Sequence, residues 1–473
     1  MNALRRSIVV LFVMLALALA ACGGGAQEQE PTAQPQPTAM MEEMEPTAAM
    51  EDMEPTDMPM EEPTDMPMEE PTAMATEMVM DEPTAEATEM AMDDGDMAEM
   101  DPLMLDGSAA GLRVALNRLL GEHVLLAMSA TNAALDGRTT DFEAAAAALD
   151  NNTLDLTSAI TAVYGEDAGA AFLELWREHI GFFVDYTTAT AAGDSAGQQA
   201  AKDDLAGYGK SFAEFLSGAT GLPTDVLEGN LQMHVASLIT VIDAQAAGDE
   251  VAQYTGLRDA YHHMASTAAA LSGAIAGQNP DLFGGDSTSS ASELRVALNN
   301  LLGEHLFLAA NATGEALNGN TAGFEAAAGA LEANTVELGE AITSVYGADA
   351  GEAFLEQWRA HIGYFVDYTQ ASAAGDESGK EAASENLSGY VTDFSAFLAG
   401  ATGLPVEALE AGLQEHVRGL SAVIDAQAAK DSTATYSELR PAYLHMQALA
   451  DALASAITGQ FPEMFPMEGM AGG

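Results

Sequence analysis

Histidines at regular intervals are the residues of this chain best suited to chemistry. His123, His179 and His234 are 56 and 55 residues apart, and the same two spacings recur farther along the chain. The second set consists of His305, His361 and His416. Imidazole nitrogens bind zinc, copper and iron. Three repeat-related helices that each point one imidazole inward would therefore form a tris-imidazole site for Zn, Cu or Fe, with an open position for water.

Each of these histidines lies on the apolar stripe of an expected helix. The residues around the first one are apolar at helical spacing: Leu112, Leu116, Leu119, Leu126 and Ala130. A buried histidine has two other roles besides metal binding. Its ring can donate to an oxygen in the core and fix the helix registry, or its titration can make the core sensitive to pH. The sequence leaves these three interpretations open, and duplication of a hairpin would also copy a structural histidine.

The part of the chain that holds the histidines is an internal duplication. Residues 112–117 read LRVALN and recur, 182 residues later, as residues 294–299. The same offset relates Trp176 to Trp358, which are the two tryptophans of the chain. We therefore expect two homologous modules at residues 106–283 and 291–465, joined by a linker at 284–290 and followed by a flexible tail at 466–473.

A shorter period, with one histidine in each repeat, divides each module into three parts. Turn signals such as Asp136-Gly137 and Gly193-Asp194 follow each histidine, and no stretch alternates between polar and apolar residues as a strand would. The predicted fold is therefore all-α, with two tandem six-helix modules of three αα-hairpins each. Periodicity alone does not distinguish a closed bundle from an open solenoid.

The helix that carries the first histidine of each module contains the pattern Leu-x-x-Leu-Leu-x-Glu-His-Val/Leu. This pattern, with the later Gly-Asp turn, resembles secreted bacterial helical-hairpin proteins of no assigned function. The resemblance covers both modules and implies no activity.

One arginine in each hairpin is present in both modules. These arginines are Arg113, Arg177, Arg258, Arg295, Arg359 and Arg440. Because the modules carry few other positive charges, we expect structural ion pairs with nearby carboxylates, with anion binding as the alternative.

Two further side-chain types accompany the histidines. Glutamates directly precede four of them: Glu122, Glu178, Glu304 and Glu415. Successive residues on a helix point about 100° apart, so these carboxylates are expected to face away from the histidines, in solvent or beside an arginine. Tyr186 and Tyr368 each follow a histidine by seven residues, which predicts a hydroxyl near an adjacent ring.

The first 21 residues have the features of a secretory signal peptide. Arg5 and Arg6 precede an apolar stretch that ends in small residues. The end of this stretch and the next residue form the segment Leu19-Ala20-Ala21-Cys22. This segment contains the single cysteine of the chain and resembles the lipobox of bacterial lipoproteins. That resemblance implies acylation of Cys22 and an extracytoplasmic protein anchored by lipid to a bacterial membrane. No later stretch is apolar enough to predict a transmembrane helix.

Residues 22–105 are expected to form a disordered, acidic stalk rich in Met, Glu, Pro and Thr. Of the 26 methionines, 17 lie between Met40 and Met104. Thioethers favour Cu(I), so the stalk is a second candidate metal-binding segment. The methionines follow the Glu-Pro-Thr repeat, and a plain spacer or an oxidant-scavenging segment explains them as well.

The formal net charge of −58 argues against nucleic acid as a partner. No phosphate-binding glycine loop, His-Glu-x-x-His motif or catalytic serine motif is present. The sequence therefore predicts a lipid-anchored extracytoplasmic helical protein with a binding or structural role rather than an enzyme, its protein or polymer ligand unidentified. The alternative is a transition-metal-binding protein that uses the inward histidines and the stalk methionines.

Overall fold

The structure, a computed structural model, describes residues 106–466, and these residues are all-α. Twelve helices are present in this part of the chain, which confirms the predicted fold class. The first module contains α2 (Ala109–Leu135), α3 (Thr139–Tyr164), α4 (Glu166–Ala192), α5 (Ser195–Thr220), α6 (Thr224–Ala247) and α7 (Glu250–Gln278). The second contains α8 (Ser290–Asn318), α9 (Thr321–Tyr346), α10 (Ala348–Ala374), α11 (Glu377–Thr402), α12 (Val406–Ala428) and α13 (Ser432–Gln460).

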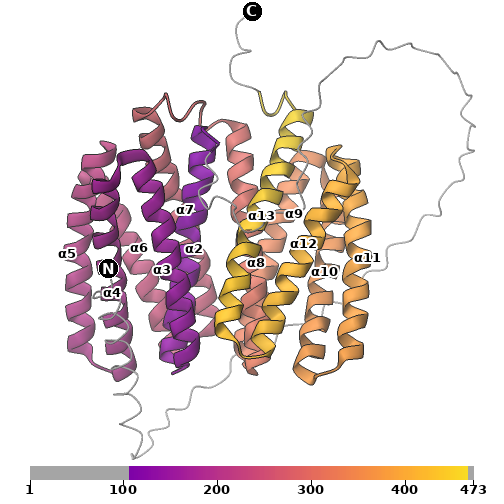
Figure 1. The fold of residues 1–473 in the computed structure, drawn as a ribbon, viewed down its shortest axis with the longest axis horizontal. Helices are drawn as coiled ribbons and strands as arrows, with labels where there is room; N and C mark the ends of the chain where they lie inside the picture. Colours follow the sequence, from indigo (N-terminus) through magenta and orange to yellow (C-terminus); the bar gives the residue numbers. More distant parts are fainter. Residues whose placement is uncertain (1–105, 467–473) are drawn as a thin grey trace, which may run out of the picture. The chain divides into compact units, whose positions relative to one another are not determined.

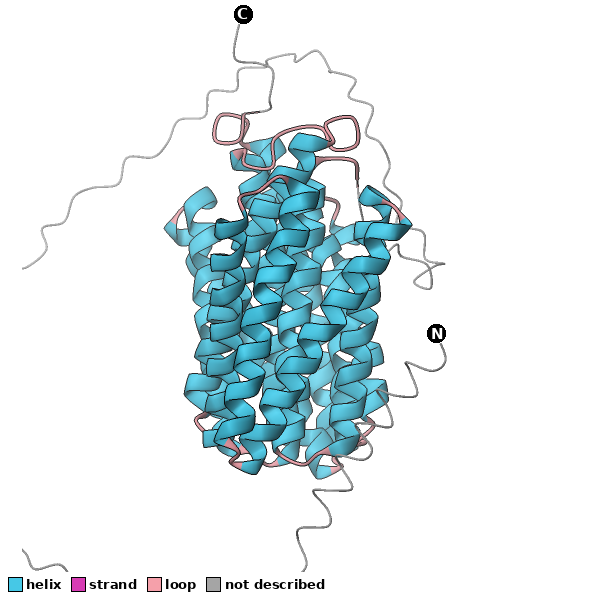
Figure 2. Cartoon of the chain, turned by 90° about the vertical axis from the view of Figure 1, so that its left-hand side faces the viewer, coloured by secondary structure: helices cyan, strands magenta, loops and turns pink. Residues whose placement is uncertain are grey.

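Local sequence signals set the ends of these helices. The Ser108 hydroxyl accepts a hydrogen bond from the Gly111 amide at the start of α2, and Asp194 and Asp249 cap α5 and α7 in the same way. Gly193 ends α4 in the left-handed region, where a side chain would be strained. The hairpins therefore fold back through short turns, and Figure 2 shows the helices running side by side with loops at both ends.

The three hairpins of each module close into a bundle, which periodicity had left open. In the first module α2 packs against α3 and also against α7, the last helix of that module. In the second module α8 likewise packs against both α9 and α13. The helix that carries the first histidine of each triad also contacts α4 and α6, or α10 and α12, so it lies in the interior of its bundle. This closure brings the repeat-related histidines together.

The two bundles pack against each other with approximate twofold symmetry. Helix α2 contacts α8, while α7 contacts α9 and its counterpart α13 contacts α3. Figure 1 shows the first module beside the second, with α2, α7, α8 and α13 in the middle. Such reciprocal contacts are those of a twofold homodimer, here formed within one chain.

Buried ion pairs cross this interface in both directions. Arg440 of α13 makes a bidentate contact with Glu122 of α2, at 2.8 and 3.1 Å, and Glu122 is only 2% exposed. Arg258 of α7 binds Glu304 of α8 in the same way, at 2.9 and 3.1 Å. The glutamate directly before the first histidine of each module is therefore paired with an arginine of the other module.

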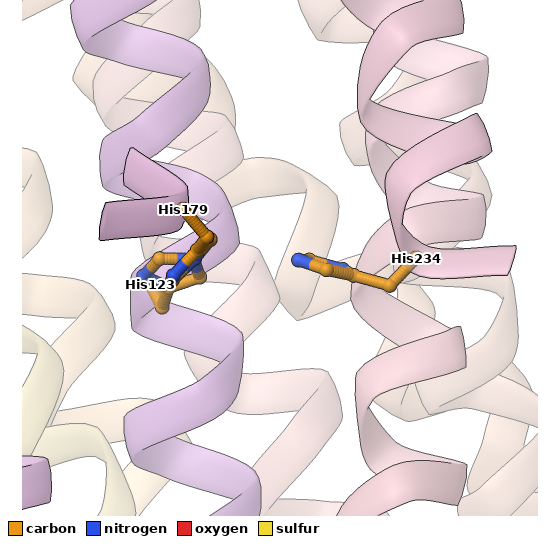
Figure 3. A group of neighbouring side chains, drawn as sticks. All are labelled: His123, His179 and His234. Carbon is orange, nitrogen blue, oxygen red and sulfur yellow. The ribbon is translucent and has the colours of Figure 1, made fainter. Parts of the chain in front are cut away.

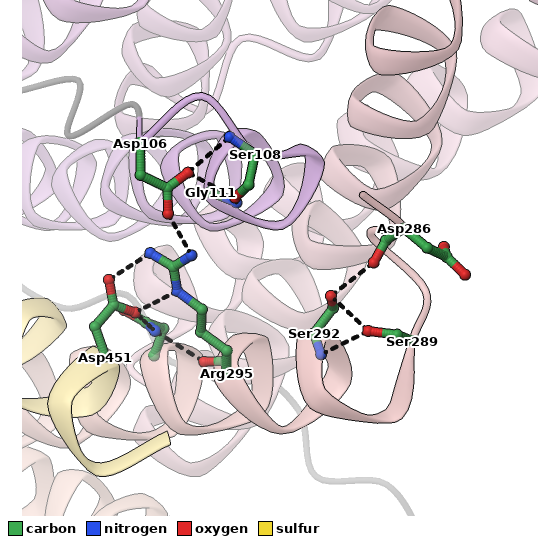
Figure 4. Close-up of polar contacts among 9 residues, drawn as sticks. Asp106, Ser108, Gly111, Asp286, Ser289, Ser292, Arg295 and Asp451 are labelled. Carbon is green, nitrogen blue, oxygen red and sulfur yellow. Dashed lines mark hydrogen bonds and ion pairs between the residues drawn. The ribbon is translucent and has the colours of Figure 1, made fainter. Parts of the chain in front are cut away.

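The start of each module is held by a second set of ion pairs. Arg113 donates to Glu293 and to the Ser287 carbonyl oxygen, so the linker packs against the first module. Arg295 binds Asp451 and Asp106, which ties the segment before α2 to the second module (Figure 4). Across residues 106–466 we find no helix long and apolar enough to cross a membrane. The predicted signal peptide, Cys22 and the stalk lie outside the described residues.

Candidate metal centre

Three helices of the first module each contribute one histidine to a single layer of the core. His123 comes from α2, His179 from α4 and His234 from α6. Their exposed fractions are 1%, 3% and 6%. Figure 3 shows the His123 and His179 rings together on one side, with the His234 ring pointing at them from the other. The structure thus places in one cluster the three residues that the 56- and 55-residue spacings singled out.

The distances between the ring nitrogens are suited to metal binding. The Nε2 atoms of His123 and His179 are 3.4 Å apart. Two nitrogens that bind one Zn²⁺ at 2.0–2.1 Å in a tetrahedral arrangement are separated by about 3.4 Å. One nitrogen of His234 completes a set in which all three lie within 4.8 Å of one another. A small inward movement of the third ring would close the coordination sphere.

The buried ring nitrogens of this cluster lack ordinary partners. Neither nitrogen of His234 has a hydrogen-bond partner, and the Nδ1 atom of His123 has none. The pair of Nε2 atoms can share one proton only when one ring carries its proton on Nε2 and the other carries its proton on Nδ1. A buried polar group without a partner costs about 1–3 kcal/mol. A bound cation takes one nitrogen from each ring, so it would give His234 a partner that neither of its nitrogens now has.

Aromatic rings surround the cluster. The Trp176 ring lies 4.8 Å from that of His123 and 4.6 Å from that of His179, while Tyr208 of α5 stacks on His179 at 5.1 Å. No sequence signal points to Tyr208, because it lies on a helix that carries no histidine and only the tertiary fold brings it to the cluster.

The second module repeats this arrangement with the same geometry. The Nε2 atoms of His305 and His361 are 3.4 Å apart, and His416 completes a set within 4.8 Å. Both nitrogens of His416 also lack partners. Tyr390 stacks on His361 at 4.8 Å between ring centroids. Because the two modules are an internal duplication, the second triad repeats the geometry of the first, and its third histidine again has no partner.

Burial keeps all six imidazoles neutral, which is the form that binds metal. It lowers the pKa of His179 and His305 from 6.5 to about 3, and that of His234 and His416 to about 4. Burial, with repulsion from the neighbouring histidines, also lowers the pKa of His123 and His361 well below 6.5. Metal binding at neutral pH would therefore displace no proton from these rings.

Two other histidines show how this chain satisfies a histidine with a structural role. The Nε2 atom of His263 lies 3.0 Å from the carbonyl oxygen of Asn230, and that of His445 lies 2.8 Å from the carbonyl oxygen of Gly412. A carbonyl oxygen can only accept, so each ring donates. His263 and His445 therefore have the structural role, in which the ring donates to an oxygen and fixes the helix registry. His234 and His416 make no such contact.

A third group of side chains that could bind a metal differs from the two histidine triads, because it contains carboxylates. It consists of His262, Glu304 and Glu337. Arg258 already binds both glutamates, at 2.9 and 2.8 Å. The His262 side chain is 47% exposed. Because the guanidinium supplies the positive charge that these carboxylates need, we do not consider this group a metal site.

The six repeated arginines all make ion pairs with carboxylates. Besides the interface and linker contacts above, Arg177 binds Asp150 and Arg359 binds Glu332. The prediction for the tyrosines was wrong. The Tyr186 hydroxyl donates to Asp243 at 2.7 Å and Tyr368 donates to Asp425, so these hydroxyls bond to carboxylates of α6 and α12 rather than approaching a histidine ring.

Comparisons with protein families, with curated proteins and with solved structures found no match for this chain. The candidate site therefore stands on its own geometry.

Proposed function

We propose that this chain is an extracytoplasmic lipoprotein whose two helical modules each bind one transition-metal ion through a histidine triad. The observation that carries this proposal is the pair of third histidines, His234 and His416, whose four buried nitrogens have no partner. Imidazole suits copper, zinc and iron, and no carboxylate or thiol belongs to either triad. The large negative charge of the chain would concentrate cations around it.

Elemental analysis of the purified chain after exposure to Cu, Zn and Fe tests the metal sites. We expect two ions per chain, one ion after His234→Leu or after His416→Leu, and none bound to the modules after both changes. A variant that lacks residues 26–101 should keep both ions, because the stalk methionines lie outside the modules. His263→Gln is the matched control, since it changes a histidine that already has a carbonyl partner.

Absence of retained metal from the wild-type chain would contradict the metal proposal. The chain would then be an anchored helical scaffold with a binding or structural role. Metal lost only when residues 26–101 are removed would instead assign binding to the methionines of the stalk.

The anchoring part of the proposal rests on Cys22 and the residues before it. In bacterial cells that express the full chain, radiolabelled palmitate should enter the wild-type protein and be absent from Cys22→Ala, because no other cysteine exists. Equal labelling of both proteins would rule out lipidation at this residue.

A further inference from the structure

Two cavities adjoin the histidine triad of the second module, one on each side. The first has a volume of about 90 Å³, and His416 and Trp358 form part of its wall. The second has a volume of about 120 Å³ and is bounded in part by His305 and His361. The first extends along the amino-terminal half of α10 and the second along its carboxy-terminal half. The triad therefore lies between them.

Both cavities are large enough for small molecules, and the first is unsuited to water. The wall of the first is apolar and includes Leu302, Phe354 and Leu413. One water needs about 10–15 Å³ on this measure of volume, and also two to four polar partners. Because an apolar wall offers none, such a cavity stays dry while still admitting small apolar molecules. The sequence predicted a water at the open position of the metal. The dry wall of the first cavity does not favour a water there.

The charge of the triad favours a monovalent ion. The three imidazoles are neutral, and no carboxylate belongs to the group, so the full charge of the ion remains in a buried site. The cost of burying an ion grows with the square of its charge and is severe in an apolar interior. Among metals that imidazole binds, copper has a monovalent state, Cu(I), and three nitrogen ligands leave it a free coordination position.

On the basis of the proposed metal site, we propose that the His305, His361 and His416 triad holds Cu(I), and that the flanking cavities admit a neutral diatomic molecule to its free coordination position. Carbon monoxide is the probe for this class. Its size suits both cavities, and it needs no hydrogen-bond partner on the apolar wall. The inference concerns reversible binding alone, in which no bond of the diatomic breaks and no electron leaves the copper.

The test uses the full chain, loaded with Cu(I) without oxygen and then exposed to carbon monoxide. Infrared spectroscopy should show a carbon monoxide band distinct from that of the dissolved gas. Ala350 lines the first cavity and Ala312 the second, so Ala350→Leu together with Ala312→Val should narrow both. We expect the variant to keep the copper content of the wild type and to bind one carbon monoxide fewer per chain. Ala411→Leu, at an exposed position of α12, should match the wild type in both measurements.

The outcomes separate this inference from the metal site on which it rests. Failure to retain copper would overturn this inference, and failure to retain zinc and iron as well would overturn the proposed function itself. Retained copper without a bound carbon monoxide band would overturn only the present inference. Full carbon monoxide binding in the narrowed variant, with its copper intact, would also overturn it, because the free position would then lie outside the cavities. Circular dichroism of each variant shows that a lost band reflects the cavity rather than an unfolded chain.

Discussion

The metal-free protein is expected to lose most of its stability between pH 7 and pH 5. Burial depresses the pKa of the six triad histidines in the folded state, whereas their ordinary pKa is 6.5. Below pH 6.5 the unfolded chain therefore binds protons that the folded chain excludes, and the free energy of unfolding falls with the pH. At pH 5 each triad histidine accounts for a loss of about 2 kcal/mol. Six such losses sum to on the order of 10 kcal/mol, comparable with the whole stability of a typical domain.

The measurement is guanidinium unfolding at pH 7.5, 6.0 and 5.0 in the presence of a chelator. The variant with His305, His361 and His416 all changed to leucine lacks three of the six groups and should lose about half as much stability over this range. Carboxylates titrate mainly below this window, with reference values of 3.8 and 4.5. Equal stability of the wild type at pH 7.5 and 5.0 would show that the triads are not held neutral by burial.

Saturating metal should oppose this loss of stability. An ion that binds only the folded state stabilises it, and it does so through the neutral form of each ring. The acid transition of the metal-loaded chain is therefore expected at lower pH than that of the metal-free chain.

Replacement of Arg440 by leucine should destabilise the protein by about 3–5 kcal/mol, because it leaves a buried carboxylate without its partner. That carboxylate is Glu122, which is 2% exposed and also accepts a hydrogen bond from Asn152 at 2.7 Å. Asp155, the second partner of Arg440, is more exposed and should contribute less. The loss is measured by denaturant unfolding at pH 7.5.

Arg418→Leu is the matched control, because its partner Glu415 lies on the same helix and the Arg418 side chain is 56% exposed. A surface pair of this kind contributes about 0–1 kcal/mol. Adding Glu122→Gln to Arg440→Leu should restore most of the lost stability, since the glutamine keeps an acceptor for Asn152 and removes the charge. Equal effects of Arg440→Leu and Arg418→Leu would mean that the interface charge is not effectively buried.

The ion pairs between the modules also bear on whether each module can fold alone. Arg440 and Arg258 each supply the counter-charge for a glutamate of the other module. An isolated module would expose the faces of α2 and α7 that pack on its neighbour. Residues 108–283 expressed alone remain the direct test, with loss of helical circular dichroism as the result that would contradict independent folding.

The amino-acid sequence by itself determined the all-α class, the duplication and the hairpin boundaries. These follow from local features, namely helical periodicity, capping residues such as Asp194 and Asp249, and glycines that end helices. The sequence also selected the six histidines, because repeats of equal length place equivalent residues at equivalent heights.

Only the tertiary structure decided whether those histidines meet. Periodicity shows which face of a helix is apolar but not how the helices close around it, and closure of α7 onto α2 is a contact between residues far apart in the chain. The stacking of Tyr208 on His179 and the pairing of Glu122 with Arg440 likewise join distant segments. Such contacts depend on how whole helices pack in three dimensions, and residue spacing along one chain carries no direct record of that packing.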